Sequence, residues 1–271
     1  MASTGSGAAP PDTSAAEAFE KYLVPTIFGP WSRDLVDTAQ AKPGDNILDI
    51  GCGTGASARY AVERVAPGGA VAAIDINAGM IAHAGTLCPP GDVDWREGDV
   101  MALPFEDGAF DTVIGNQVLQ FLKDKPGALA EARRVLKPGG RLVLTVWCKI
   151  ELCPGHCAVA SSLQAHGVDA AGILHPYSYN DAVALGDVIQ QAGFRDVAVT
   201  RRFREARFAS ARAFVEALAA GGPSSRLALE KLDADGLQQV IAEVTDALAE
   251  YTDETGVTIV TTSHVVVARR Q

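Results

Sequence analysis

The sequence predicts an α/β fold, in which short buried strands alternate with helices and form one open sheet. Three observations lead to this class. Residues 46–55, N-I-L-D-I-G-C-G-T-G, join a short apolar run to a glycine-rich turn, and residues 56–65 then place apolar side chains at helical spacing. Two further strand candidates, 71–74 and 93–97, each lead to an acidic residue. A chain of 271 residues suits one large domain with insertions.

The glycine-rich turn is the first candidate ligand site. Gly51, Gly53 and Gly55 stand at alternate positions between the expected strand and helix. Residues without side chains let the backbone turn sharply and let a ligand approach it. Ligands of open α/β sheets bind at such strand ends. The spacing Gly51-x-Gly53-x-x-Ala56 also fits a relaxed dinucleotide fingerprint, so the turn alone leaves two ligand classes open.

Three acidic residues at successive strand ends favour one of these classes. Asp49, Asp75 and Asp99 follow or end the first three strands. Carboxylates at this edge repel a pyrophosphate and attract a cation. They suit a ligand with amino, sulfonium, ribose and adenine groups better than a diphosphate. A dinucleotide-dependent oxidoreductase is therefore disfavoured, and the chain also lacks a second substrate domain.

Composition narrows the choice of partner and compartment. The formal net charge is −10, and the only basic cluster is 201–204, which argues against a nucleic-acid partner. No apolar run reaches the roughly 18 residues of a membrane span, and the N-terminus lacks a secretory pattern. Five cysteines without a C-x-x-C pair suggest reduced thiols in the cytoplasm. The cluster of Cys148, Cys153, His156 and Cys157 fits no usual spacing of metal ligands, so we predict no metal.

Expected strands and helices continue to alternate along the chain as far as the fifth strand. The segment 1–13 is interpreted as a disordered tail, and 14–42 as two helices ahead of the first strand. Segments 148–175 and 204–252 are interpreted as parts of a substrate lid, the first mobile and the second helical. The other expected elements are helices at 77–87, 128–136 and 180–193, and strands at 110–114, 141–146, 197–200, 257–260 and 264–268, the last two being one strand broken in the middle.

Five segments resemble, in order, the motifs of class I S-adenosylmethionine-dependent methyltransferases. The resemblance is greatest to the branch that includes the quinone-biosynthesis C-methyltransferases and many small-molecule methyltransferases, and it covers residues 45–147. The segments are D-I-G-C-G-T-G (49–55), A-I-D-I (73–76), G-D-V-M-A-L-P-F (98–105), F-D-T-V-I-G-N-Q (110–117) and R-V-L-K-P-G-G-R-L-V-L (134–144).

This resemblance implies a fold for residues 14–271. The expected architecture is a Rossmann-like, seven-stranded, mostly parallel sheet with an antiparallel last strand and helices on both faces. N-terminal helices and a helical lid insertion would complete the domain. Residues 45–147 would form the cofactor-binding core.

The resemblance also implies the cofactor S-adenosyl-L-methionine, the product S-adenosyl-L-homocysteine and a set of binding residues. Asp75 would accept hydrogen bonds from both ribose hydroxyls, Ile76 would lie on the adenine, and Asp99 with the Val100 amide would bind the adenine edge. The full expected set is Tyr22, Trp31, Arg33, Asp49, Gly51, Cys52, Gly53, Asp75, Ile76, Asp99, Val100, Asn116 and Gln117.

The expected function is methyl transfer to an O, N or C atom of a small molecule, such as a natural product or a quinone-like compound. The protein would act as a monomer or homodimer. The alternative is a cofactor-binding protein with a regulatory role or another chemistry. A macromolecular acceptor is disfavoured by the acidic balance and the long lid. Asn116-Gln117-Val118-Leu119 lacks the Pro-Pro-aromatic pattern of enzymes that methylate nucleobases or protein glutamine.

A general base would assist an acceptor that must lose a proton. Histidine is the usual base near neutral pH. The candidates in the segment that borders the expected pocket are His156, His166 and His175. We predict His175, because the chain returns there to the carboxyl side of the sheet.

Overall fold

The computed structural model describes residues 11–271, so most of the expected tail at 1–13 lies outside the described residues. Its centre is an eight-stranded sheet in the order β3-β2-β1-β4-β5-β8-β6, with the two-residue β7 paired to β8. Strands β1 to β5 pair in parallel, and β8 runs antiparallel to β5 and β6. The strands are β1 (Asn46–Ile50), β2 (Ala70–Asp75), β3 (Val93–Glu97), β4 (Phe110–Asn116), β5 (Leu136–Trp147), β6 (Phe194–Phe208), β7 (Thr252–Asp253) and β8 (Gly256–Arg270).

This topology confirms the predicted sheet and adds β7. The chain order reverses between β1 and β4, so the loops after these two strands diverge and leave a crevice at their carboxyl ends. The strands β1, β2 and β4 are buried on both faces, which explains their nearly continuous apolar runs, whereas the edge strand β3 is partly exposed and carries charged residues. Ile47 of β1 packs with the core on one face, and the adjacent Leu48 packs with the core on the other.

Helices cover both faces of the sheet. Helices α2 (Gly29–Ala39) and α3 (Ala56–Val65) bury apolar side chains against one face. Helices α5 (Lys125–Val135) and α8 (Ala182–Gln191) bury theirs against the other. The short helix α4 (Ala78–Ala84) lies beside β2 and β3. The apolar cores on the two faces hold the carboxyl ends of the strands in fixed positions, and so fix the position of the crevice at these ends.

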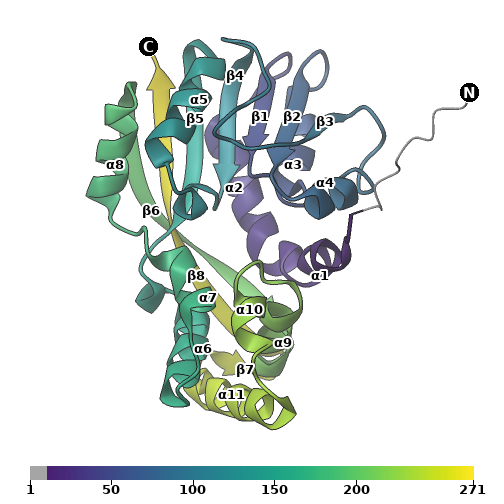
Figure 1. The fold of residues 1–271 in the computed structure, drawn as a ribbon, viewed down its shortest axis with the longest axis vertical. Helices are drawn as coiled ribbons and strands as arrows, with labels where there is room; N and C mark the ends of the chain where they lie inside the picture. Colours follow the sequence, from purple (N-terminus) through teal and green to yellow (C-terminus); the bar gives the residue numbers. More distant parts are fainter. Residues whose placement is uncertain (1–10) are drawn as a thin grey trace, which may run out of the picture.

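A helical lobe stands on the extended ends of β6 and β8 (Figure 1). The pairing of β8 with β5 ends at Ser263, so residues 256–262 of β8 project past β5 together with the matching part of β6. The lobe packs around this ribbon as one apolar core, which also receives the N-terminal helix α1 (Ser14–Tyr22). Its helices are α6 (Pro154–Ala165), α7 (Ala171–Leu174), α9 (Ala211–Gly221), α10 (Ser225–Leu229) and α11 (Ala234–Ala247).

The structure of this part of the chain differs from the expectations at three points. The strand expected at 197–200 is the longer β6, so the helical part of the second lid segment begins at Ala211 rather than at 204. The segment expected to be mobile contains the twelve-residue helix α6. The last strand is continuous, although the polar run Thr261–Ser263 suggested a break. Their burial is offset by hydrogen bonds, because Trp31 donates to Thr261, Gln117 donates to Ser263, and Thr262 donates to the backbone oxygen of Leu152.

No helix in residues 11–271 is both long and apolar enough to cross a membrane. The same range holds no group of three or more His, Cys, Asp or Glu side chains arranged to bind a metal ion.

Candidate functional site

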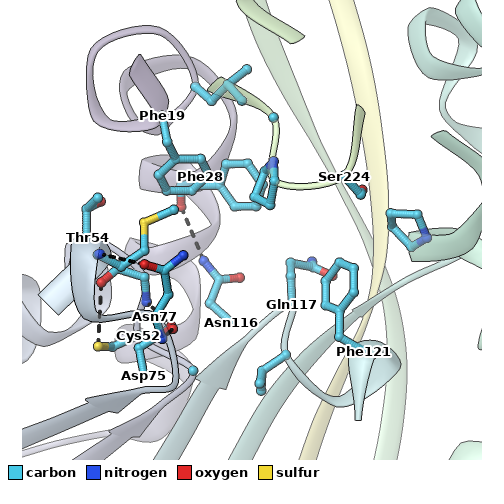
Figure 2. A pocket seen from close by; sticks show the side chains of 18 of the residues that line it. Phe19, Phe28, Cys52, Thr54, Asp75, Asn77, Asn116, Gln117, Phe121 and Ser224 are labelled. Carbon is cyan, nitrogen blue, oxygen red and sulfur yellow. Dashed lines mark hydrogen bonds between the residues drawn. The ribbon is translucent and has the colours of Figure 1, made fainter. Parts of the chain in front are cut away.

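A cavity of about 810 Å³ lies between the glycine-rich loop, the carboxyl ends of β2 to β4 and the helical lobe. Figure 2 shows two sides of it, with Cys52 and Asp75 on one side, Gln117 and Phe121 on the other, and Asn116 between them. The cavity brings together eleven of the fourteen residues predicted for the site, which are Asp49, Gly51, Cys52, Gly53, Asp75, Ile76, Asp99, Val100, Asn116, Gln117 and His175.

The glycine-rich loop presents bare backbone to this cavity. Gly51 and Gly53 adopt positive φ angles of 62° and 55°, where a side chain would be strained. A Cβ atom on Gly51 would lie 2.3 Å from a methyl carbon of Val118. At Gly53 the nearest atom to such a Cβ would be on Phe19, 3.9 Å away. Gly51 is therefore fixed by close packing, and Gly53 keeps an open approach for a ligand.

Asp75 ties this loop to the end of β2. Its carboxylate accepts hydrogen bonds from the backbone amides of Gly53, at 2.8 Å, and Asn77, at 2.9 Å. Burial raises the pKa of Asp75, and these amides oppose the shift. A carboxylate offers about four acceptor positions. Asp75 thus retains capacity to accept hydrogen bonds from hydroxyl groups of a ligand.

Asp49 is a buried carboxylate without a partner. The residue is only 1% exposed, and neither carboxylate oxygen has a partner in hydrogen-bonding geometry among the described residues. Burial raises the pKa of Asp49 to about 8, the nearby backbone amide of Ala58 opposes the shift, and the charge of Asp75 adds to it. Unpaired buried polar groups are rare and call for an explanation. A cationic group bound in the cavity would supply the missing partner.

The outer end of the cavity combines an apolar and an acidic surface. Ile76 is 72% exposed although it directly follows the buried strand β2. Asp99 is exposed and accepts a hydrogen bond from the Met101 amide at 2.9 Å, while Val100 beside it is buried. The exposed Ile76 side chain can pack against the face of a flat heterocycle. The loop at Asp99 and Val100 can form hydrogen bonds with the edge of the same ring.

Asn116 and Gln117 line the cavity, but their amide groups are used within the protein. Asn116 donates to Ser32 Oγ at 3.0 Å and accepts from Thr145 Oγ1 at 2.6 Å. Gln117 has a positive φ of 59° and donates to Ser263 Oγ at 2.8 Å. These bonds join β4 to α2, β5 and β8, so both residues fix the shape of the cavity floor.

Three residues predicted on the N-terminal helices, Tyr22, Trp31 and Arg33, do not line the cavity. Trp31 is fully buried and donates to Thr261 Oγ1 at 2.9 Å. Arg33 lies over the ring of Tyr60, 4.7 Å from its centroid. Tyr22 is 40% exposed and does not line the cavity. The helices present other side chains instead, namely Phe19, Leu23, Ile27, Phe28 and Ser32.

A π-helical turn at Val24–Phe28 explains this difference from the expectation. It shifts the phase between α1 and α2, so that α-helical spacing does not identify the inward face. For the four apolar residues of this set, the only sequence signal is their apolar character, which is shared with the rest of the core, and Ser32 carries no distinguishing signal.

The three candidate histidines occupy different environments. His175 is exposed, lines the cavity and lies 6.0 Å from Phe121 between ring centroids. His156 also lines the cavity but is buried. His166 lies outside it and contacts Glu243 at 2.7 Å. Sequence reasoning missed the aromatic wall formed by Phe28, Phe121, Trp147 and Tyr177.

Comparison with known proteins identifies the family. A family model described as a methyltransferase domain matches residues 48–144. Nocamycin O-methyltransferase of Saccharothrix syringae is 32% identical over 206 residues, which cover 70% of this chain and 73% of that enzyme. The chain belongs to the class I S-adenosylmethionine-dependent methyltransferases. This confirms the family, and with it the class of cofactor, expected from the five motifs.

Further matches place this methyltransferase in the UbiE-like branch. A ubiquinone/menaquinone biosynthesis C-methyltransferase of Xanthomonas oryzae is 45% identical over 115 residues, 41% of this chain and 46% of that enzyme. The match therefore spans less than half of either protein. The phosphoethanolamine N-methyltransferase 2 structure of Haemonchus contortus has a TM-score of 0.60 at 19% identity, covering 94% of this chain and 57% of that chain. This last similarity is one of fold.

Proposed function

We propose that the protein transfers a methyl group from S-adenosyl-L-methionine to a small-molecule acceptor and releases S-adenosyl-L-homocysteine. The observation that carries the proposal is the unpaired Asp49 carboxylate beside the glycine-rich loop of a methyltransferase. The cavity volume of about 810 Å³ is near the top of the roughly 300–1,000 Å³ range of single-ligand pockets. It suits a cofactor and an acceptor together.

The residues around the loop fit the parts of the cofactor. Asp49 would lie near the ammonium group, and the backbone of Gly51, Cys52 and Gly53 would follow the methionyl chain. Asp75 would accept hydrogen bonds from the ribose hydroxyls. Ile76 would cover one face of the adenine, while Asp99 and the Val100 amide would bind its edge.

The protein's part in the reaction is mainly positioning. The cofactor supplies an electrophilic methyl group when bound. The protein must hold an acceptor atom in line with this group and exclude water. The aromatic wall of Phe28, Phe121, Trp147 and Tyr177 would serve both needs, since it restricts the acceptor and keeps the centre dry. His175 would accept a proton from an acceptor that is neutral before the reaction.

The compartment, the oligomeric state and the class of acceptor are also part of the proposal. The five cysteines are free, which suits the reducing cytoplasm. We propose a monomer or homodimer that acts without nucleic acid. The acceptor is an O, N or C nucleophile of a small molecule, such as a natural product or a quinone-like compound.

Product analysis tests this function. The protein is incubated with S-adenosyl-L-methionine and a panel of phenols, naphthols and reduced quinones, and S-adenosyl-L-homocysteine and methylated products are measured. We expect equal amounts of the two products from at least one acceptor. Tight cofactor binding without product from any acceptor class would instead favour the regulatory alternative.

The affinity for S-adenosyl-L-homocysteine is expected to rise about tenfold between pH 6 and pH 7. Asp49 is mostly protonated in the free protein because its pKa is about 8, and it must release a proton to pair with an ammonium group. The rise should level off near pH 8, where Asp49 of the free protein has already lost its proton. Calorimetry in buffers of different ionisation heat measures both the affinity and the released proton. A flat profile, or the same slope in Asp49→Asn, would contradict the assignment.

The same carboxyl is expected to destabilise the cofactor-free protein at alkaline pH. Its folded-state pKa is raised above the roughly 3.9 of an unfolded aspartate, so its stabilising contribution is complete below that pH and is lost as the pH rises toward 8. Asp49→Asn should therefore raise the free energy of unfolding at pH 8 by a few kcal/mol and much less at pH 4. Urea unfolding at both values measures this, and an equal effect at the two would refute it.

A further inference from the structure

The half of the cavity formed by the lobe differs in charge from the half formed by the sheet. The carboxylates that line the cavity, Asp49, Asp75 and Asp99, all come from the sheet side. Its lining lysine, Lys123, also lies outside the lobe, in the loop after β4. Among the described residues, the lobe contributes apolar side chains, serines and two histidines, which include His156, Ile173, His175, Tyr177, Leu218 and Ser224.

A series of aromatic rings leads from the cofactor half into this lobe half. Trp147 lies 6.2 Å from Phe28, which belongs to the N-terminal helices, and 6.0 Å from Tyr177, with which it stacks. Tyr177 in turn lies 5.6 Å from His156. Aromatic faces of this kind bind flat apolar groups. The wall is therefore suited to an extended planar body, with His156 at its far end.

His156 is a polar group held in this apolar wall without a partner. It is 8% exposed and packs edge-on against Phe214 at 5.2 Å. Its Nδ1 atom is buried and makes no hydrogen bond with the described residues. Burying a polar atom without a hydrogen bond costs free energy, unless a ligand or a water molecule forms the missing bond. The cavity that His156 lines is the place from which a ligand can reach the ring.

The surroundings keep this imidazole uncharged. Burial lowers the pKa of His156 to about 4, and burial raises the pKa of the neighbouring Tyr177 and brings that of Cys153 to about 12. A neutral imidazole offers one donor and one acceptor. A cationic amine in this half would lose its hydration without gaining an opposite charge. A neutral hydroxyl or carbonyl group would instead pair with the ring.

We infer that the lobe half binds an uncharged acceptor with a planar apolar body, and that His156 selects it by a hydrogen bond to a hydroxyl or carbonyl oxygen. The inference rests on the proposed function and names its substrate class. His156 acts here on specificity, whereas the proton transfer is proposed for a different residue, His175. Amine acceptors that are cationic at neutral pH are excluded by the same half of the cavity.

Three naphthalene probes test this selection in the full-length protein saturated with S-adenosyl-L-homocysteine. The probes are naphthalene, 2-naphthol and 2-naphthylmethylamine, which share one ring system and differ in the polar group. Equilibrium dialysis at pH 7 should show that 2-naphthol binds about threefold to tenfold more tightly than naphthalene, the range of one hydrogen bond. The ammonium probe should bind at least tenfold more weakly than 2-naphthol.

Variants assign the effect to His156. His156→Leu should bring the affinity ratio of 2-naphthol to naphthalene close to one, while naphthalene binding is kept. His156→Gln should retain part of the ratio, because its amide still forms hydrogen bonds. His166→Leu is the matched control, since this histidine lies in the lobe outside the cavity, and it should leave the ratio unchanged.

The possible outcomes separate this inference from the proposed function. A ratio near one in the wild type, or ammonium binding as tight as naphthol binding, overturns the selection by His156 while cofactor binding stands. Failure of the wild type to bind S-adenosyl-L-homocysteine overturns the proposed function itself. If His156→Leu proves unfolded by thermal denaturation, the wild-type ratios and His156→Gln still decide the question.

Discussion

Replacing Asp75 by alanine is expected to weaken the binding of S-adenosyl-L-homocysteine by a factor of 100 or more. Two hydrogen bonds from ribose hydroxyls to a charged carboxylate contribute about 1.5–3 kcal/mol each, and 1.4 kcal/mol corresponds to about a factor of ten. The substitution also removes the acceptor for the amides of Gly53 and Asn77, so the loop loses its anchor to β2. Both effects act on cofactor affinity and neither requires knowledge of the acceptor.

Titration calorimetry with S-adenosyl-L-homocysteine and, separately, NAD measures this effect. Asp94→Ala is the control, because Asp94 lies on the adjacent strand β3 outside the cavity and pairs with Arg96 at 2.7 Å. It should bind like the wild type, since an exposed pair contributes little. Binding of NAD, or equal affinities in wild type and Asp75→Ala, would mean that the acidic strand ends do not form a ribose site.

The parallel core was predictable because local and tertiary signals agree there. The strands β1, β2 and β4 and the second half of β5 are apolar runs next to turn residues, and parallel sheets bury such runs on both faces. The extensions of β6 and β8 lack this signal. Residues 201–207 of β6 are mostly charged, because one face of this edge strand is exposed. In β8, buried threonines and a serine replace the expected apolar residues, and their partners come from distant segments.

The residues of the candidate site that lie near strand ends could be located from the sequence, whereas those on helices could not. The positions of Asp49, Asp75 and Asp99 at the cavity could be predicted because each lies at or near the carboxyl end of a parallel strand. The walls that come from helices were missed, since only packing decides which helical face turns inward. Phe19 and Phe28 face the cavity, whereas Trp31, an equally good candidate by sequence, is buried against the lobe.

His175→Ala is expected to lower kcat about 100-fold with any acceptor hydroxyl that is neutral in solution, the lower limit for loss of a general base. His175 lies on the exposed side of the cavity, opposite Phe121 of the loop after β4, so it can exchange its proton with solvent after each turnover. The affinity for S-adenosyl-L-homocysteine should not change, because the residues proposed to bind the cofactor lie on or after β1 to β4. Steady-state kinetics with saturating cofactor measures kcat for both proteins.

The acidity of the acceptor distinguishes a base from a packing residue. An acceptor that is already ionised at the assay pH, such as a nitro-substituted phenol, needs no base, so His175→Ala should methylate it nearly as fast as the wild type. His166→Ala should match the wild type with both acceptors, because His166 pairs with Glu243 away from the cavity. An equal loss with neutral and ionised acceptors would show that His175 only shapes the cavity. Full activity of His175→Ala with neutral acceptors would mean that positioning alone drives the transfer, as in-line attack on a sulfonium carbon permits.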